Sequence, residues 1–415
     1  MSAYRLFLVV SAVGAFAGNT AFTLNLVYQS QVVGLGPWQL ILVGTLMEVV
    51  CFAAQVPTGV IADLYSRRLS VVVGYLLMGS GLLLWGLLPA YAALLVANVV
   101  WAIGAVCVDG AQEAWAADEI GEQRVGAAFV RAGQLAQAGT LLGIVAAVAL
   151  ASVDLALPIV VAAGLTLALG AMLALVMPER GWAPAPAGDR TTLGAMRTQV
   201  VAGGVAVRRS RVLGYVLVGT LFLGLSSEGF DRLSQPRFVE ELTLPAQLTP
   251  QLWLGAFAVV AALGSIALTG LLGRLVDVNR PRRVGLLLVA VEAASAAAML
   301  CFGLTGAIWP AVGAYLAAAL LRHAAAPVLN VWMVANTSSA ARATVFSLQS
   351  QVDAVGQIAG GPPAGWVGQR ASMGAGIATS GAFLLPAVLC FALAARRIPA
   401  VAALPRRVAV AEPAA

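Results

Sequence analysis

Long apolar segments alternate with short polar gaps along the whole chain of 415 residues. A helix needs about 20 predominantly apolar residues to cross a bilayer, and cutting the sequence at charges, prolines and polar clusters leaves about twelve such segments. The predicted spans are 5–28, 38–62, 70–89, 91–115, 125–150, 155–177, 211–233, 250–273, 284–304, 307–335, 342–368 and 373–395. The pattern therefore predicts an all-α integral membrane protein.

Two longer gaps interrupt this pattern. Residues 178–210 are rich in Pro, Gly and Arg and have weak apolar periodicity, which is typical of a linker. The sequence therefore predicts a six-helix bundle over 1–177, a linker over 178–210, a second six-helix bundle over 211–395 and a tail over 396–415. Residues 234–249 are expected to form an external loop with a short interfacial turn.

The composition excludes a soluble protein with one core, because 60% of the residues are hydrophobic and only 10% are charged. Each of the four cysteines lies inside an apolar run without CxxC spacing, so we expect neither a disulfide framework nor a metal site. The sequence contains no phosphate loop of the GxxxxGK type. We therefore expect no nucleotide and no other cofactor.

Arginine side chains gather on one side of the predicted helices. That side holds Arg5, Arg67, Arg68, Arg124, the arginines of the linker, Arg274, Arg280, Arg282, Arg283, Arg342, Arg396, Arg397, Arg406 and Arg407. The opposite loops hold Arg237 and Arg370, with Arg232 at a helix end. The positive-inside rule then predicts a multi-pass protein of the cytoplasmic (inner) membrane with both termini and the linker in the cytoplasm. We interpret the net charge of +6 as orientation in the lipid bilayer, expect no nucleic-acid partner, and expect a monomer.

A charged motif recurs between the two predicted bundles. The gap between the second and third spans reads PTGVIADLYSRR, and an imperfect copy between the eighth and ninth reads GRLVDVNRPRR. A second echo joins RVGAAFVRAGQLAQAGTLLG, from Arg124, with RATVFSLQSQVDAVGQIAGG, from Arg342. Two echoes at similar offsets predict that the halves are structural repeats.

Gly59, Asp63, Arg67 and Arg68 resemble the loop signature of the major facilitator superfamily, with Leu64 and Ser66 departing from it. The resemblance implies two six-helix pseudo-repeats around a central cavity, working by alternating access. It also implies that Asp63 lies near the start of the eleventh helix, where NTSSAARA offers a positive helix terminus. The predicted conformational latch consists of Gly59, Asp63, Arg67, Arg68, Asp277, Arg282 and Arg342. Alternatively, these charges only orient the helix and solvate the loop.

Ionisable residues inside the predicted spans are functional candidates, because a charge in the bilayer needs a partner or a cavity. Glu48 lies midway along the second span. Asp109 and Glu113 are four residues apart and are expected on one face of the fourth span, with Arg131 of the fifth as their counter-charge. This group is either a proton carrier or a structural ion-pair cluster.

Further candidates lie in the second bundle. Glu228, Asp231 and Arg232 share a helix face at the end of the seventh span and form either an external gate or a helix cap. Asp353 lies mid-span among glutamines, as expected for a cavity-facing acid. His323, the single histidine, either relays protons or is packed and hydrogen-bonded.

The run GQIAGGPPAG contains Gly356, Gly360 and Pro362. It resembles the Gly-Pro signature that drug/proton antiporters of the superfamily carry on helix five, but here it lies on the eleventh span. Small residues let helices approach closely, and proline favours a kink. We therefore expect Gly356, Gly360 and Pro362 to serve helix packing.

The sequence favours a secondary active transporter that exports small amphipathic molecules in exchange for protons. An importer or facilitator of a polar metabolite is the alternative within transport, and a non-transporting membrane sensor is the alternative from another class. An enzyme is not expected, because the sequence has a single His and neither an HExxH nor a GxSxG motif.

Overall fold

A computed structural model describes residues 1–181, 210–277, 279–337 and 339–398, and all elements within them are helices. The first half of the chain forms α1 (Ala3–Phe22), α2 (Asn25–Gln31), α3 (Pro37–Leu64), α4 (Arg67–Leu87), α5 (Tyr91–Val108), α6 (Ala111–Ile120), α7 (Glu122–Ala151) and α8 (Leu157–Val176). The second half forms α10 (Arg211–Glu240), α11 (Pro250–Leu275), α12 (Pro281–Leu304), α13 (Ile308–Asn336), α14 (Ser339–Arg370) and α15 (Met373–Arg396).

Within these residues, 11 helical segments are long and apolar enough to cross a membrane. The more polar α14, with 32 residues, is also long enough to cross it. The chain is therefore an all-α integral membrane protein, as the apolar pattern predicts. The predicted linker lies outside the described residues from 182 to 209, and the predicted tail from 399 to 415.

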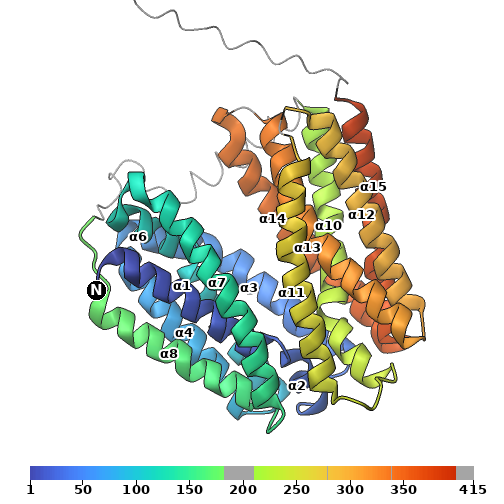
Figure 1. The fold of residues 1–415 in the computed structure, drawn as a ribbon, viewed down its shortest axis with the longest axis horizontal. Coiled ribbons are helices and arrows are strands. Elements are labelled where there is room, and N and C mark those ends of the chain that lie inside the picture. Colours follow the sequence, from blue (N-terminus) through green and yellow to red (C-terminus); the bar gives the residue numbers. More distant parts are fainter. Residues whose placement is uncertain (182–209, 278, 338, 399–415) are drawn as a thin grey trace, which may run out of the picture.

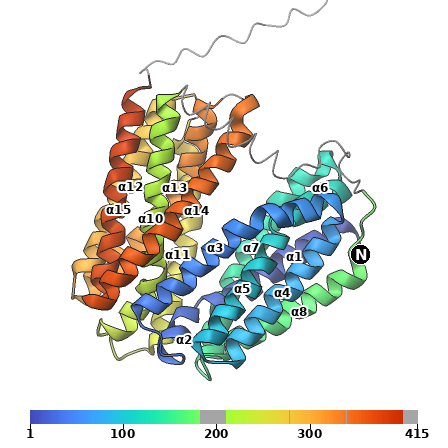
Figure 2. The same cartoon turned by 180° about the vertical axis from the view of Figure 1, so that it is seen from behind.

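The helices form two bundles that meet at one end and separate at the other (Figures 1 and 2). The bundles converge near α2, which we call the closed end, and diverge toward α6 and the beginning of α14, which we call the open end. One hydrophobic core spans both halves and includes Ile41, Leu233, Leu254 and Ala364. Two further cores each lie within a single half. The shared core holds the two halves together at the closed end, whereas each of the other two cores stabilises one half alone.

The same helix crossing occurs once in each half. In the first half, the backbone of α1 approaches α7 at Gly139 and Gly143, where an added Cβ would lie 2.5 Å from the carbonyl oxygens of Ala12 and Phe16. In the second half, Gly356 and Gly360 of α14 meet the carbonyl oxygens of Leu221 and Leu225 of α10 in the same way. The glycines are four residues apart in both places, so equal small-residue spacing builds the equivalent crossings.

The structure differs from three of the predicted elements. The first span is interrupted between α1 and α2, and the fourth is interrupted after Val108. Asp109 caps α5, and Gly110 takes a φ of 73°, so the chain turns before α6. The expected external loop from 234 is helical as far as Glu240, because α10 continues through Pro236 and buries Phe238 in the shared core.

Candidate functional site

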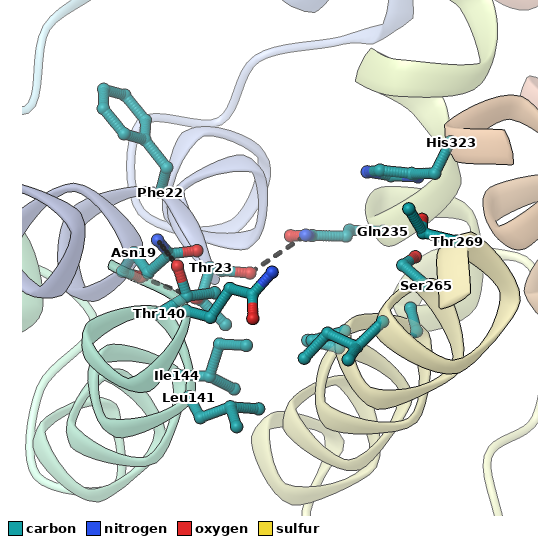
Figure 3. Close-up of a pocket in the computed structure, with 15 residues that line it drawn as sticks. Asn19, Phe22, Thr23, Thr140, Leu141, Ile144, Gln235, Ser265, Thr269 and His323 are labelled. Atoms are coloured by element: carbon teal, nitrogen blue, oxygen red, sulfur yellow. Dashed lines mark hydrogen bonds between the residues drawn. The ribbon is translucent and has the colours of Figure 1, made fainter. Parts of the chain in front are cut away.

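The main cavity lies between the two halves and has a volume of about 540 Å³. Figure 3 shows side chains of α1 and α7 facing those of α10, α11 and α13 across it. Its lining consists of Asn19, Phe22, Thr23, Gln137, Thr140, Leu141, Ile144, Gln235, Ala258, Ala261, Ala262, Ser265, Ile266, Thr269 and His323.

Hydrogen bonds fix the polar groups of the main cavity. Asn19 Nδ2 donates to Thr140 Oγ1 over 3.0 Å, and Gln235 Nε2 donates across the interface to the Thr23 carbonyl over 2.9 Å (Figure 3). His323 Nδ1 lies 2.7 Å from the Ala319 carbonyl. A carbonyl only accepts, so Nδ1 carries the hydrogen in this arrangement. Among the lining residues that the structure describes, the polar groups are amides, hydroxyls and this imidazole, without a carboxylate.

A second cavity, which we call the acidic cavity, has a volume of about 370 Å³. It lies between α3 and α5 of the first half and α14 of the second. Glu48 and Asp109 line it beside Cys51, Gln55 and Gln357. Two of the predicted proton or substrate candidates thus face one space at the interface.

A third cavity, the second-half cavity, lies among α10, α12, α13, α14 and α15 and has a volume of about 320 Å³. Arg322 Nη1 donates to Asp231 Oδ1 over 2.7 Å, and Nη2 donates to Oδ2 over 2.9 Å. Gln357 Nε2 donates to Asp353 Oδ2 over 2.8 Å. Gln357 also lines the acidic cavity, so the two cavities are neighbours.

Glu228 and Arg232 lie where α10 meets α3. Arg232 Nε is 3.3 Å from Glu228 Oε2, and the Glu228 side chain is only 4% exposed. A Cβ on Gly44 of α3 would overlap both side chains. This ion pair therefore packs against the first half, while Asp231 of the same helix turns to the second-half cavity.

The expected Asp109, Glu113 and Arg131 cluster is wrong. The turn at Gly110 places Asp109 at the end of α5 and Glu113 in the first turn of α6, so they do not share one helix. Arg131 Nη1 donates to Gln134 Oε1 over 3.1 Å. Within the described part of the chain, Arg131 forms no ion pair with either carboxylate.

Arg67 and Arg68 of the predicted latch make contacts within the first half. Arg67 pairs with Asp118 of α6 and donates to the Ala114 carbonyl over 3.2 Å. Arg68 donates from Nη2 to the Ala174 carbonyl over 2.7 Å, and from its backbone N–H to Glu179 Oε1 over 2.9 Å. These bonds attach the α3–α4 connection to α6 and to the end of α8. The surroundings of Gly59 and the side chain of Asp63 lie outside what the structure describes.

The latch candidates of the second half make local contacts. Asp277 lies 3.4 Å from Arg280 Nε, and Arg282 is exposed. Arg342, near the start of α14, is half-buried, and its Nε has no hydrogen-bond partner among the described residues. Since the bundles diverge at this end, a latch that joins the halves remains a prediction for another conformation.

The helix-packing candidates face two neighbours. Gly356 and Gly360 contact α10, whereas Gly361 contacts Thr45 and Ile41 of α3 in the other half. Pro362 lies inside the continuous α14. One helix face thus serves packing within the second half, and the adjacent face serves packing between the halves.

Sequence reasoning omitted Arg322 and Glu292 from the site. Both are ionisable residues inside predicted spans, a signal that could have identified them. It also assigned Arg237 to an external loop. Arg237 is in fact 4% exposed; Nη2 donates to the Thr305 carbonyl over 2.8 Å, and Nε lies 3.3 Å from Glu241 Oε2.

Two bundles of membrane-spanning helices with cavities at their interface are typical of membrane transporters. Residues 6–352 match the family model described as Major Facilitator Superfamily. The chain belongs to this superfamily, as the Asp63 motif and the half-repeat predict.

Known relatives agree with this assignment. An uncharacterized MFS-type transporter, YxaM of Bacillus subtilis (strain 168), is 22% identical over 362 residues, covering 86% of this chain and 87% of that protein. The solved structure of the nucleoside transporter NupG has a TM-score of 0.76 at 12% identity, covering 96% of this chain and 100% of that one. A bacterial homologue of the lysosomal transporter Spinster, described as inward-facing and unoccupied, has a TM-score of 0.70 at 15% identity, with 95% and 96% covered.

The structure of a peptide transporter POT in complex with sulfate has a TM-score of 0.74 at 15% identity. It covers 95% of this chain and 94% of that one. Nucleoside and peptide transporters are thus among the proteins with this fold, and such low identities show the shared fold alone.

Proposed function

We propose that this protein exports small amphipathic molecules by alternating access in exchange for protons. The main cavity carries this proposal. Its lining combines apolar side chains such as Phe22 and Leu141 with amides and hydroxyls such as Asn19 and Thr140. An apolar pocket with a few placed polar groups suits a molecule that has both kinds of surface.

Proton coupling is supported by carboxylates that lie beside the main cavity and outside it. Glu48 and Asp109 face the acidic cavity, and Asp231 and Asp353 face the second-half cavity. Intramembrane carboxylates that face a cavity are the usual elements of proton relays. Separate sites for the substrate and for protons suit a protein that moves one across the membrane in exchange for the other.

The distribution of arginines indicates which end of the protein faces the cytoplasm. By the positive-inside rule, the end that bears Arg67, Arg68 and Arg342 is cytoplasmic, and so are both termini. We propose that the protein lies in the inner membrane. In this arrangement, the closed end near α2 lies on the outer side, and the open end faces the cytoplasm. In a variant without the four native cysteines, single cysteines placed at the exposed residues 2 and 247 are labelled with an impermeant maleimide on intact cells, and only the second is expected to react.

Transport into proteoliposomes tests the function. Purified protein is reconstituted with a panel of fluorescent amphipathic compounds, and uptake is measured with and without an imposed pH gradient. We expect a gradient in the exchange direction to stimulate uptake at least tenfold over protein-free vesicles. Equal uptake in both gradient directions would remove proton exchange from the proposal. The Glu122→Gln variant, which changes an exposed carboxylate, serves as the matched control.

Import of a polar metabolite is the second candidate. The second-half cavity favours it, because Ser226, Ser227, Asn330 and Gln349 line that space beside the charged groups. The same vesicles distinguish the two functions, since polar solutes moving with the proton gradient support import. Light scattering of the purified protein checks whether it is the expected monomer.

A further inference from the structure

Inside the membrane-spanning part of the second half, the four carboxylates of Glu228, Asp231, Glu292 and Asp353 lie near two guanidinium groups, those of Arg232 and Arg322. Glu228 pairs with Arg232, and Asp231 pairs bidentately with Arg322. Asp353 accepts a hydrogen bond from Gln357, which leaves Glu292 of α12. Glu292 is 2% exposed, lines the second-half cavity, and has neither a hydrogen bond nor an ion pair with any residue that the structure describes. This buried carboxyl group lacks a partner in an otherwise paired cluster.

The surroundings of Glu292 decide whether its carboxyl group is protonated or ionised. From α13, Arg322 is the cation whose charge reaches it, but both terminal nitrogens of Arg322 donate to Asp231. The cavity is also lined by the apolar Leu384 of α15 and by Asp353 of α14, which is another acid. An ionised carboxylate in the middle of a span is unfavourable without a counter-charge. The surroundings in this arrangement therefore favour the protonated, neutral form of Glu292.

We propose that Glu292 is a proton-binding site and that Arg322 exchanges its partner from Asp231 to Glu292 when this proton leaves. The inference rests on the proton coupling of the proposed function and names a site for it. The O–H bond of the Glu292 carboxyl group breaks, and the proton passes to water in the cavity. Arg322 gives up its two bonds to Asp231 and donates to the new carboxylate. Asp231, whose side chain is 50% exposed, then takes hydrogen bonds from water.

The position of Asp231 links this exchange to the contact between the halves. Asp231 precedes Arg232 on α10, and Arg232 with Glu228 packs against Gly44 of α3. Breaking the Arg322–Asp231 pair releases α10 from α13 next to that contact. Such a two-state element, biased by one proton, is what couples a binding site to a conformational change.

Infrared spectroscopy of the full-length protein in lipid nanodiscs tests the site without any transported substrate. A protonated carboxyl group has a C=O stretch that is separate from the carboxylate bands, and a pH titration records its loss. We expect one such band to disappear as pH rises in the wild type and to be absent in Glu292→Gln. The band should persist to higher pH in Arg322→Gln, because the cation that would stabilise the ionised form is missing. Glu122→Gln, changed at an exposed carboxylate, should keep the wild-type titration.

Two outcomes would overturn the inference. One is an unchanged titration in Glu292→Gln, and the other is loss of the band in Asp353→Asn in place of Glu292→Gln. If Glu292→Gln fails to fold, Glu292→Asp decides, because a titrating residue shifts the band whereas a structural residue leaves it unchanged. Proton binding at Glu292 is measured here without transport, so a failed transport assay and a failed titration are separate results.

Discussion

The α1–α7 crossing of the first half and the α10–α14 crossing of the second have the same backbone but different side chains. Both use glycines four residues apart against carbonyl groups of the partner helix. The register that aligns Ala12 with Leu221 and Phe16 with Leu225 places Glu228 at the position of Asn19. It likewise places Gln357 at the position of Thr140. The scaffold is repeated, whereas the chemistry is not.

Because of this difference, we expect the two halves to have different roles in transport. Asn19 and Thr140 are joined by a neutral hydrogen bond and face the main cavity. Glu228 belongs to an ion pair, and Gln357 holds the carboxylate of Asp353. A neutral hydrogen bond suits recognition of an uncharged surface, whereas charged groups respond to protons. We infer that the first half contributes more to substrate recognition and the second half more to coupling.

The largest expected effect comes from filling the crossings themselves. Gly360→Val and Gly143→Val each place a side chain against a partner backbone, so each should destabilise the protein by about 3 kcal/mol or more. Thermal unfolding in detergent measures the loss. Gly164→Val is the matched control, because a Cβ there has no neighbour within 4 Å. Unequal effects of the two crossing variants would contradict their equivalence.

A smaller effect is expected from breaking the charged pair of the second half. Arg322→Gln leaves Asp231 without its partner, and since that carboxylate is half exposed, the expected cost is about 1–3 kcal/mol. Proton-driven transport should fall at least tenfold. The double variant Asp231→Asn with Arg322→Gln removes both charges, so it should regain stability without regaining transport. Recovery of transport in the double variant would show that the pair is structural.

A shift in conformation is expected from the contact between the halves. Gly44→Ala adds a methyl group where Glu228 and Arg232 pack, which disfavours the arrangement closed near α2. A tenfold change in population corresponds to about 1.4 kcal/mol. Spin labels on the exposed Glu113 of α6 and Ser350 of α14 should report a shorter distance in the variant. Gly18→Ala, with open space at its Cβ, should leave the distance distribution unchanged.

The smallest expected effect lies in the first half. Thr140→Val removes the acceptor of the Asn19 bond at nearly constant volume and should cost about 1 kcal/mol. Apparent affinity for an amphipathic substrate should change severalfold, with the same dependence of transport on pH as in the wild type. A changed pH profile would mean that the first half also takes part in coupling.

Much of the fold could be predicted from the sequence, but less of the site. The positions of the spans follow from apolar segments, because lipid accepts only helices that satisfy their own backbone. The break at Asp109 and Gly110 escaped this reasoning, since a polar Asp-Gly pair within an apolar run is also compatible with a continuous helix. Its consequence was the incorrect grouping of Asp109 with Glu113.

The sequence alone determined the membrane class, the two related halves and the superfamily, because hydropathy, repeats and the Asp63 motif are local properties of the chain. Only the tertiary structure decided which charges meet. Arg322 is 91 residues from Asp231, and Glu292 lies on a third helix. Whether a buried charge has a partner depends on helices that are distant in sequence, and helical periodicity does not specify that pairing.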